Sequence, residues 1–174
     1  YIGSTGYNWY NAKQSAKAAQ IYAGVITALN NGQDAEVYKI TDQLIADLPS
    51  TEVAAMSAMQ AAKLSFTKKN YVQAEKYLLW TKDKASDKSL QSLAALRLAS
   101  VYIDQKKFDK AREMLKVKHD LSFDGLFYEG RGDMYIAMGD LNKARDAYKE
   151  GLQKAANDPS TQQAIQMKLD IIGG

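Results

Sequence analysis

The sequence predicts an all-α fold in which helical hairpins follow one another along the chain. One motif recurs at intervals of about 34 residues, which is typical of helical repeats. Apolar residues recur at helical spacing between short polar turns, and the 174 residues include only two prolines. A chain of this length buries a sizeable core, so we expect one domain or one short array of repeats.

The motif consists of a small residue, a large hydrophobe nine positions later, and an alanine three positions after that. Its three copies are Ala62, Tyr71 and Ala74, then Ala99, Phe108 and Ala111, then Gly132, Leu141 and Ala144. The final alanines are 37 and then 33 residues apart, which brackets the tetratricopeptide period. We expect the alanines to lie where two helices cross, and the large hydrophobes to pack between neighbouring hairpins. Arrays of this kind usually bind other proteins.

Four hairpins are expected, at about residues 10–48, 50–80, 90–117 and 123–155, followed by a capping helix at 159–172. The first hairpin lacks the motif and is interpreted as a degenerate terminal repeat. Asp34 is expected to cap its second helix, and the polar run at 81–88 is expected to form a loop. Asp158 followed by Pro159 marks the start of the capping helix, which would cover the apolar face of the last hairpin.

The first helices of the hairpins are expected to line a partner-binding groove. In tetratricopeptide arrays the inner surface carries signature positions 2, 5, 9 and 12, counted with the motif alanine at position 20. In the three motif-bearing hairpins these positions give Met56, Met59, Lys63, Phe66, Leu93, Leu96, Ser100, Ile103, Leu126 and Glu129, with Asp133 and Ile136 completing the set. Apolar and methionine side chains suit a helix or a non-native segment of another protein. Coverage by the capping helix, or by a tighter superhelix, is the alternative.

Charge is distributed unevenly along the chain. Residues 60–118 contain 14 Lys and Arg against 6 Asp and Glu, whereas the whole chain has a net charge of +3. The excess indicates either a partner surface or a solvated lysine-rich face. Nucleic-acid binding is disfavoured, because the aromatic residues of this segment fall mostly at packing positions.

No constellation of catalytic or metal-binding residues is present. The absence of cysteine excludes disulfides and zinc–thiolate sites, and His119, interpreted as a surface-loop residue, is the one histidine. The sequence has neither a nucleophile elbow nor a glycine-rich phosphate loop. The tripeptide at 131–133 (RGD) falls inside a predicted helix, which disfavours an adhesive role. We therefore expect a protein that is not an enzyme and uses no metal or cofactor.

Four aromatic residues gather at the start of the chain, namely Tyr1, Tyr7, Trp9 and Tyr10. Tyrosine and tryptophan favour the membrane–water interface, where an apolar ring and a polar edge are both satisfied. Residues 1–9 are therefore interpreted as a membrane-proximal segment that follows a transmembrane helix absent from this chain, with the domain at 10–174. Packing of the rings on the first hairpin is the alternative.

Several stretches resemble one bacterial family. They are residues 6–11 (GYNWYN), 96–99 (LRLA), 131–133 (RGD), 139–140 (GD), 144–148 (ARDAY) and 166–170 (QMKLD). The chain resembles the ancillary subunits of the SecYEG translocon (YfgM-like), whose tetratricopeptide domain is grouped with that of the cell-division coordinator CpoB. The repeat residues are generic to the superfamily, whereas the first and last stretches are more specific.

The resemblance implies a single-pass protein of the bacterial inner membrane whose domain faces the periplasm. It implies two partners, the SecYEG translocon and a membrane-anchored periplasmic chaperone, along with client segments of secreted proteins. The sequence is also compatible with two other functions. One is a self-associating cell-envelope or division scaffold, and the other is a cytosolic co-chaperone that clamps a terminal carboxylate. The clamp needs several converging cations, and Lys63 is the one that the middle of the groove offers.

Overall fold

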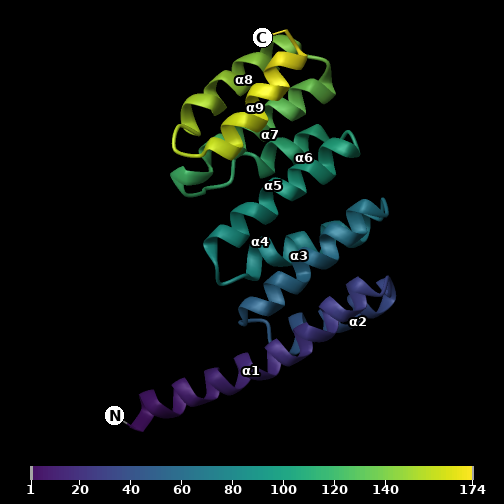
Figure 1. Ribbon diagram of the computed structural model, residues 1–174, viewed down its shortest axis with the longest axis vertical. Helices are drawn as coiled ribbons and strands as arrows, with labels where there is room; N and C mark the ends of the chain where they lie inside the picture. The colour runs from purple at the N-terminus through teal and green to yellow at the C-terminus, as the bar shows by residue number, and fades with distance from the viewer. Residues whose placement is uncertain (1, 174) are drawn as a thin grey trace. The chain divides into compact units, whose positions relative to one another are not determined.

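Antiparallel helical hairpins make up the part of the chain that the structure describes (Figure 1). The structure is a computed structural model that describes residues 2–173. Every regular element within these residues is helical, comprising α-helices α1 to α9 and one short 3₁₀ helix, Leu121–Phe123. The predicted all-α array of hairpins with a capping helix is confirmed. The chain divides into two compact units, Tyr1–Gln91 and Ser92–Gly174.

The first unit contains two hairpins. Helices α1 (Ile2–Asn30) and α2 (Asp34–Asp47) form the first, and α3 (Glu52–Thr67) and α4 (Tyr71–Lys84) form the second. Five alanines of α3 expose 2% of their surface or less, namely Ala54, Ala55, Ala58, Ala61 and Ala62. Because alanine adds so little bulk, the backbone of α3 approaches its neighbours closely, and α3 contacts α1, α2 and α4.

A tyrosine of α4 connects this packing to a polar contact. Tyr77 is fully buried, its ring stacks on Tyr38 with centroids 6.1 Å apart, and its hydroxyl lies 3.0 Å from Asp42 Oδ1. A buried phenol needs such an acceptor, because a polar group left unpaired in the interior is costly. Burial, followed by the hydrogen bond and charge of Asp42, raises the pKa of Tyr77 well above its ordinary value.

The second unit holds most of α5 (Lys88–Asp104) and four further helices. These are α6 (Phe108–Met114), α7 (Asp124–Met138), α8 (Leu141–Lys154) and α9 (Pro159–Ile171). Helices α7 and α8 form the last hairpin, and α9 packs mainly on α8 and also touches α7. The predicted start of the capping helix is confirmed, because Asp158 accepts a hydrogen bond from the Thr161 backbone N–H and Pro159 occupies the first turn.

Helices α8 and α9 share a small hydrophobic core. Ala144 and Tyr148 of α8 pack with Ile165 and Leu169 of α9, and all four side chains are 3% exposed or less. Partly buried Tyr135, Leu152 and Ile172 surround this cluster. The apolar face that the last hairpin would otherwise expose is thereby covered, which is the role expected of a terminal capping helix.

The turns inside the three motif-bearing hairpins share one backbone conformation. Gly139 ends α7 in the left-handed region, with φ 81°, and Lys69 and Lys106 hold the same motif position at φ 60° and 58°. Glycine adopts this conformation without strain, whereas a side chain disfavours it. Asn70 and Asp140 then cap α4 and α8 by accepting backbone N–H groups. The turn is thus kept by the hairpin geometry even where lysine occupies it.

Three details of the sequence prediction differ from the structure. Gln33 is the capping residue of α2 and Asp34 is its first helical residue, where a carboxylate is favourable beside the helix dipole. The expected loop at 81–88 is shorter, because α4 continues through Lys84 and α5 starts at Lys88. Helix α1 includes residues 2–9, ahead of the predicted start at residue 10.

The motif alanines are buried, as predicted for residues at helix crossings. Ala74, Ala111 and Ala144 are completely buried, and Tyr71 and Phe108 are half-buried. Leu141 is the exception, because 48% of it is exposed. Leu141 is the first residue of the second helix of the last hairpin, and a single helix rather than a full hairpin follows. The expected packing between neighbouring hairpins is therefore wrong at this position.

Gly132 is required by the close crossing of α7 and α8. An added Cβ at this position would overlap the aromatic ring of Tyr148, sixteen residues later. The equivalent pairs in the other two hairpins are Ala62 with Leu78 and Ala99 with Leu115. A methyl group is therefore present where the facing residue is leucine, and absent where it is the larger tyrosine.

Gly132→Ala is expected to destabilise the second unit by about 1–2 kcal/mol, since overpacking costs more than the gain in helix propensity. Urea unfolding of Gly132→Ala, Tyr148→Leu and the double variant measures this effect. The double variant should lose less free energy of unfolding than the two single losses together. Gly6→Ala is the control, because an added Cβ there meets no atom within 4 Å. Strictly additive losses would contradict the proposed contact.

Candidate protein-interaction surface

The ten predicted partner-binding residues all lie on the first helices of the hairpins, α3, α5 and α7. We call these residues the candidate face of the unit in which they lie, with the four residues of α3 in the first unit and the six of α5 and α7 in the second. Met56, Lys63 and Ser100 are exposed, whereas Phe66, Leu93, Leu96, Ile103, Leu126 and Glu129 are half-buried. Met59 is only 6% exposed and belongs to the core, so it offers almost no surface to a partner.

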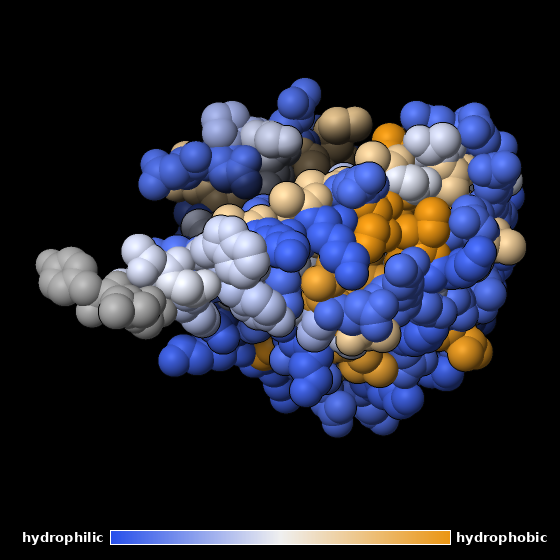
Figure 2. Space-filling model, turned by 90° about the horizontal axis from the view of Figure 1, so that it is seen from below, coloured by the Kyte–Doolittle hydropathy of each residue, from blue (hydrophilic) through white to orange (hydrophobic). Residues whose placement is uncertain are grey.

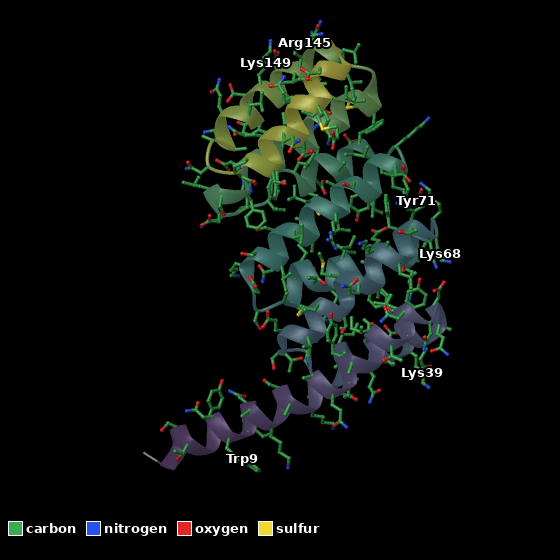
Figure 3. The ribbon with its side chains drawn as sticks, in the orientation of Figure 1. Trp9, Lys39, Lys68, Tyr71, Arg145 and Lys149 are labelled. Carbon is green, nitrogen blue, oxygen red and sulfur yellow. The ribbon has the colours of Figure 1, made fainter. Side chains whose placement is uncertain are left out.

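In the first unit the candidate face combines apolar and cationic groups along α3, with Met56 near its start and Phe66 near its end. Met56 exposes 37% of its surface, and the Phe66 ring meets Tyr71 edge-on with centroids 6.0 Å apart. The Lys69 ammonium lies 5.6 Å from the centre of the Phe66 ring, within the range of a cation–π contact. Figure 3 shows Lys68 and Tyr71 beside each other at the α3–α4 turn. An apolar segment that carries a carboxylate fits these side chains.

In the second unit α9 covers part of the candidate face. The Lys168 ammonium lies 2.7 Å from Glu129 Oε1 and 2.8 Å from both carboxylate oxygens of Asp133. The hydroxyl of Tyr148 donates to the same Asp133 carboxylate over 2.7 Å. Glu129 is therefore held in an ion pair within the chain, and its side chain is only 15% exposed. For this residue the alternative of coverage by the capping helix applies.

The Lys168 contacts decide the charge state of this cluster. Burial alone would lower the pKa of Lys168, but hydrogen bonds and charges from Asp133 and Glu129 outweigh burial and raise it. Burial, then the bond to Asp133, raises the pKa of Tyr148. A group whose pKa is raised on folding contributes stability at every pH below its pKa in the unfolded chain, which is near 10 for Lys and Tyr. That contribution is lost as the pH rises through the pKa of the folded state. The cluster is thus intact throughout the neutral range.

Two motifs singled out in the sequence have structural roles. Arg131 donates to the Leu115 carbonyl over 3.0 Å and its guanidinium lies 4.5 Å from the Tyr128 ring centre, so the 131–133 tripeptide is engaged within the unit. His119 lies in a loop, as predicted, but its side chain is only 12% exposed rather than on the surface. Its ring stacks on Phe127 with centroids 3.7 Å apart, and its Nε2 lies 2.9 Å from Asp124 Oδ1. No group of side chains that could hold a metal ion occurs among the described residues.

The aromatic residues at the start of the chain project from α1. Tyr7, Trp9 and Tyr10 are 67%, 65% and 54% exposed, so these three rings do not pack on the first hairpin. Tyr1, the fourth residue of this prediction, lies outside the described residues. Within the described chain, none of the helices combines the length and the apolar character that crossing a membrane requires.

Sequence reasoning did not identify Lys168 as the residue that covers Glu129. The two residues are 39 positions apart, and nothing in either local pattern indicates that they meet. The sequence contained a partial signal. Glu129 and Asp133 share one helix face with Ile136, and a capping helix with only apolar residues would bury these two carboxylates without a cation.

The paired helices, the buried small residues at their crossings and the terminal capping helix define a tetratricopeptide-like protein-interaction array. A family model described as a tetratricopeptide repeat-like domain matches residues 1–174. Proteins called ancillary SecYEG translocon subunit are similar over nearly the whole chain. The one from Neisseria gonorrhoeae is 32% identical over 99% of this chain and 83% of its own length.

Two further relatives carry the same name. The protein from Aggregatibacter actinomycetemcomitans is 29% identical over 97% of this chain and 82% of its own length. The protein from Escherichia coli K12 is 25% identical over 95% of this chain and 80% of its own length. The chain belongs to the family of ancillary SecYEG translocon subunits. The predicted family is thereby confirmed, and with it a Sec-associated role in protein interaction.

Lys168→Ala is expected to destabilise the docking of α9 by about 1–2 kcal/mol, because it leaves Glu129 and Asp133 without their cation. Hydrogen exchange of the α9 amides, together with urea unfolding, measures the loss. Lys149→Ala serves as the control, since Lys149 is an exposed lysine on α8 (Figure 3). Equal stability of the two variants would show that the ion pairs do not hold the helix.

Proposed function

We propose that this domain is a non-enzymatic docking module that links the Sec channel to periplasmic chaperones. Membership of the translocon-subunit family is the single observation that carries the proposal, because similarity extends over nearly the whole chain. The helical array supports it, since such arrays present extended surfaces to other proteins. Client segments that emerge from the channel are a third class of occupant for the same surface.

The proposed location is the bacterial inner membrane, with the domain facing the periplasm. The relatives are translocon subunits by name, which supports membrane association, because a translocon is a membrane channel. The exposed aromatic side chains of α1 support a membrane-proximal start of the domain, as Tyr and Trp concentrate at membrane interfaces. A single membrane-spanning helix ahead of residue 1 belongs to this proposal.

Each unit has its own proposed docking surface, which consists of exposed and half-buried residues of the candidate face. These residues are Met56, Lys63 and Phe66 of α3 in the first unit, and Leu93, Leu96, Ser100 and Ile103 of α5 in the second. A half-buried ring such as Phe66 loses little conformational entropy on binding and can fill a pocket of a partner. Methionine adapts to partners of different shape.

A photoreactive amino acid at position 66 of the membrane-anchored full-length protein tests this surface. We expect crosslinks to a membrane-anchored periplasmic chaperone or to a translocon subunit, identified by mass spectrometry. Position 72 is the matched control, because Val72 is 81% exposed on α4, the second helix of the same hairpin. Crosslinks confined to the chain itself, or equal capture from positions 66 and 72, would remove the candidate face from consideration.

A second function, self-association as a cell-envelope scaffold, is favoured by one observation. Met167 and Ile171 lie one turn apart on α9 and are 60% and 82% exposed. An apolar pair at the terminal helix of the array suits contact with the same helix of a second copy. On this alternative the protein sediments as a dimer, and Met167→Gln with Ile171→Gln gives a monomer. A monomeric parent protein at high micromolar concentration would contradict it.

A further inference from the structure

Residues 6–17 of α1 form a stretch of helix that is almost entirely exposed. Among the residues whose side chains the structure describes, those at positions 4–17 are exposed except Gln14, which is half-buried, and Ala18 is the first buried residue. This stretch includes Gly6, Asn8 and Asn11, which are poor helix formers, and an isolated helix of such length is marginal in water. Its surroundings therefore have to supply the stabilisation that packing supplies to the second half of α1.

The large apolar groups of this stretch are confined to one level of the helix. Tyr7, Trp9 and Tyr10 fall within roughly 4.5 Å along the axis, at 1.5 Å per residue, and spread over roughly 160° of its circumference. Figure 3 shows Trp9 pointing away from the ribbon. In Figure 2 the coloured residues on the visible face of the projecting end of α1 carry no orange surface. The following two turns, at 11–17, contain no large apolar residue.

This arrangement differs from that of a helix that docks lengthwise on a protein. Lengthwise docking repeats apolar residues at i+3, i+4 and i+7, so that a stripe follows the axis. The i+3 position from Tyr7 is Tyr10 itself, but the other such positions from Tyr7 and Tyr10 carry Asn11, Lys13, Gln14 and Lys17, so no apolar stripe continues along the axis. The rings instead suit a thin interfacial layer that the helix axis crosses. Such a layer has an apolar phase on one side and water on the other.

The cationic groups of this part of α1, together with Gln14, lie on the side of this level toward the packed half of the helix. Gln14 donates to the Tyr10 hydroxyl over 2.5 Å, and the Lys13 ammonium lies 5.1 Å from the Trp9 ring centre. Lys13 and Lys17 are the two charged residues of the first 33, and the first carboxylate is Asp34. A stretch with cations only, next to aromatic rings, complements an anionic lipid surface.

We propose that Tyr7, Trp9 and Tyr10 form an aromatic collar that sits in the lipid headgroup layer, with α1 as a strut between that layer and the first hairpin. The helix is unbroken from the collar to its packed half, so about 12 Å of helix separates Tyr10 from Ala18. This distance would hold the first hairpin just outside the headgroups. The inference rests on the proposed function to the extent that the domain works beside a membrane channel.

The test uses Trp9 as a depth probe. Trp80→Phe leaves Trp9 as the one tryptophan. The chain is held on phosphatidylethanolamine–phosphatidylglycerol vesicles by an N-terminal hexahistidine tag and nickel-chelating lipid, and a C-terminal tag is the matched control. With the N-terminal tag, Trp9 emission should shift to the blue, and bromine near the headgroup should quench it more than bromine at the acyl-chain ends.

Side-chain variants keep the result specific. Tyr7→Ser with Tyr10→Ser should remove most of the shift, whereas Val72→Ser with Leu121→Ser should preserve it, as these residues are 81% and 80% exposed elsewhere. Neither pair touches the core, so circular dichroism of the hairpins should not change. An unshifted Trp9 with the N-terminal tag would overturn the proposal, as would a shift that requires reconstituted translocon, which would assign the collar to a protein. Capture of partners from position 66 is independent of both outcomes, so the collar and the proposed function fail separately.

Discussion

Close approach of two helices at a small residue is the constraint on which each motif-bearing hairpin depends. At Gly132 the ring of Tyr148 occupies the space that a Cβ would need, and the buried Ala62 and Ala99 hold the equivalent positions. Since protein interiors are packed to the density of crystals, one extra methyl group at such a crossing forces the helices apart. The second helix of each hairpin, and the turn before it, can be positioned only when this contact is made.

The same packing decides which surfaces the domain presents. The second helices bury their alanines against the first helices, and the first helices keep one face partly open. Along that face burial differs from residue to residue, because Met59 lies in the core whereas Met56 and Lys63 reach solvent. In the last hairpin α9 covers this face, because Lys168 of α9 forms an ion pair with Glu129 of α7. The helices that meet there also share an apolar core. The surface offered to partners is therefore smaller than the set of signature positions.

Helix α1 combines two kinds of stabilisation in one element. From Ala18 onward its buried residues contact α2 and α3, and hydrophobic burial holds it in place. Before Ala18 it presents rings and lysines to its surroundings, so its stability there depends on what lies next to it. The stability of the start of α1 is therefore set by its environment, whereas that of the second half of α1 is set by packing on α2 and α3.

The sequence by itself determined the fold class, the motif register and the start of the capping helix, because these follow from local spacing. Small residues, turn formers and the Asp158–Pro159 pair act within a few residues of the chain, and their effects are readable without tertiary structure. Tertiary structure decided the burial of Met59, the stacking of His119 on Phe127 and the ion pairs of Lys168 with Glu129 and Asp133. It also decided that Tyr7, Trp9 and Tyr10 do not pack on the first hairpin. These features depend on how far helices extend and which side chains meet across them, and local spacing carries no information about either.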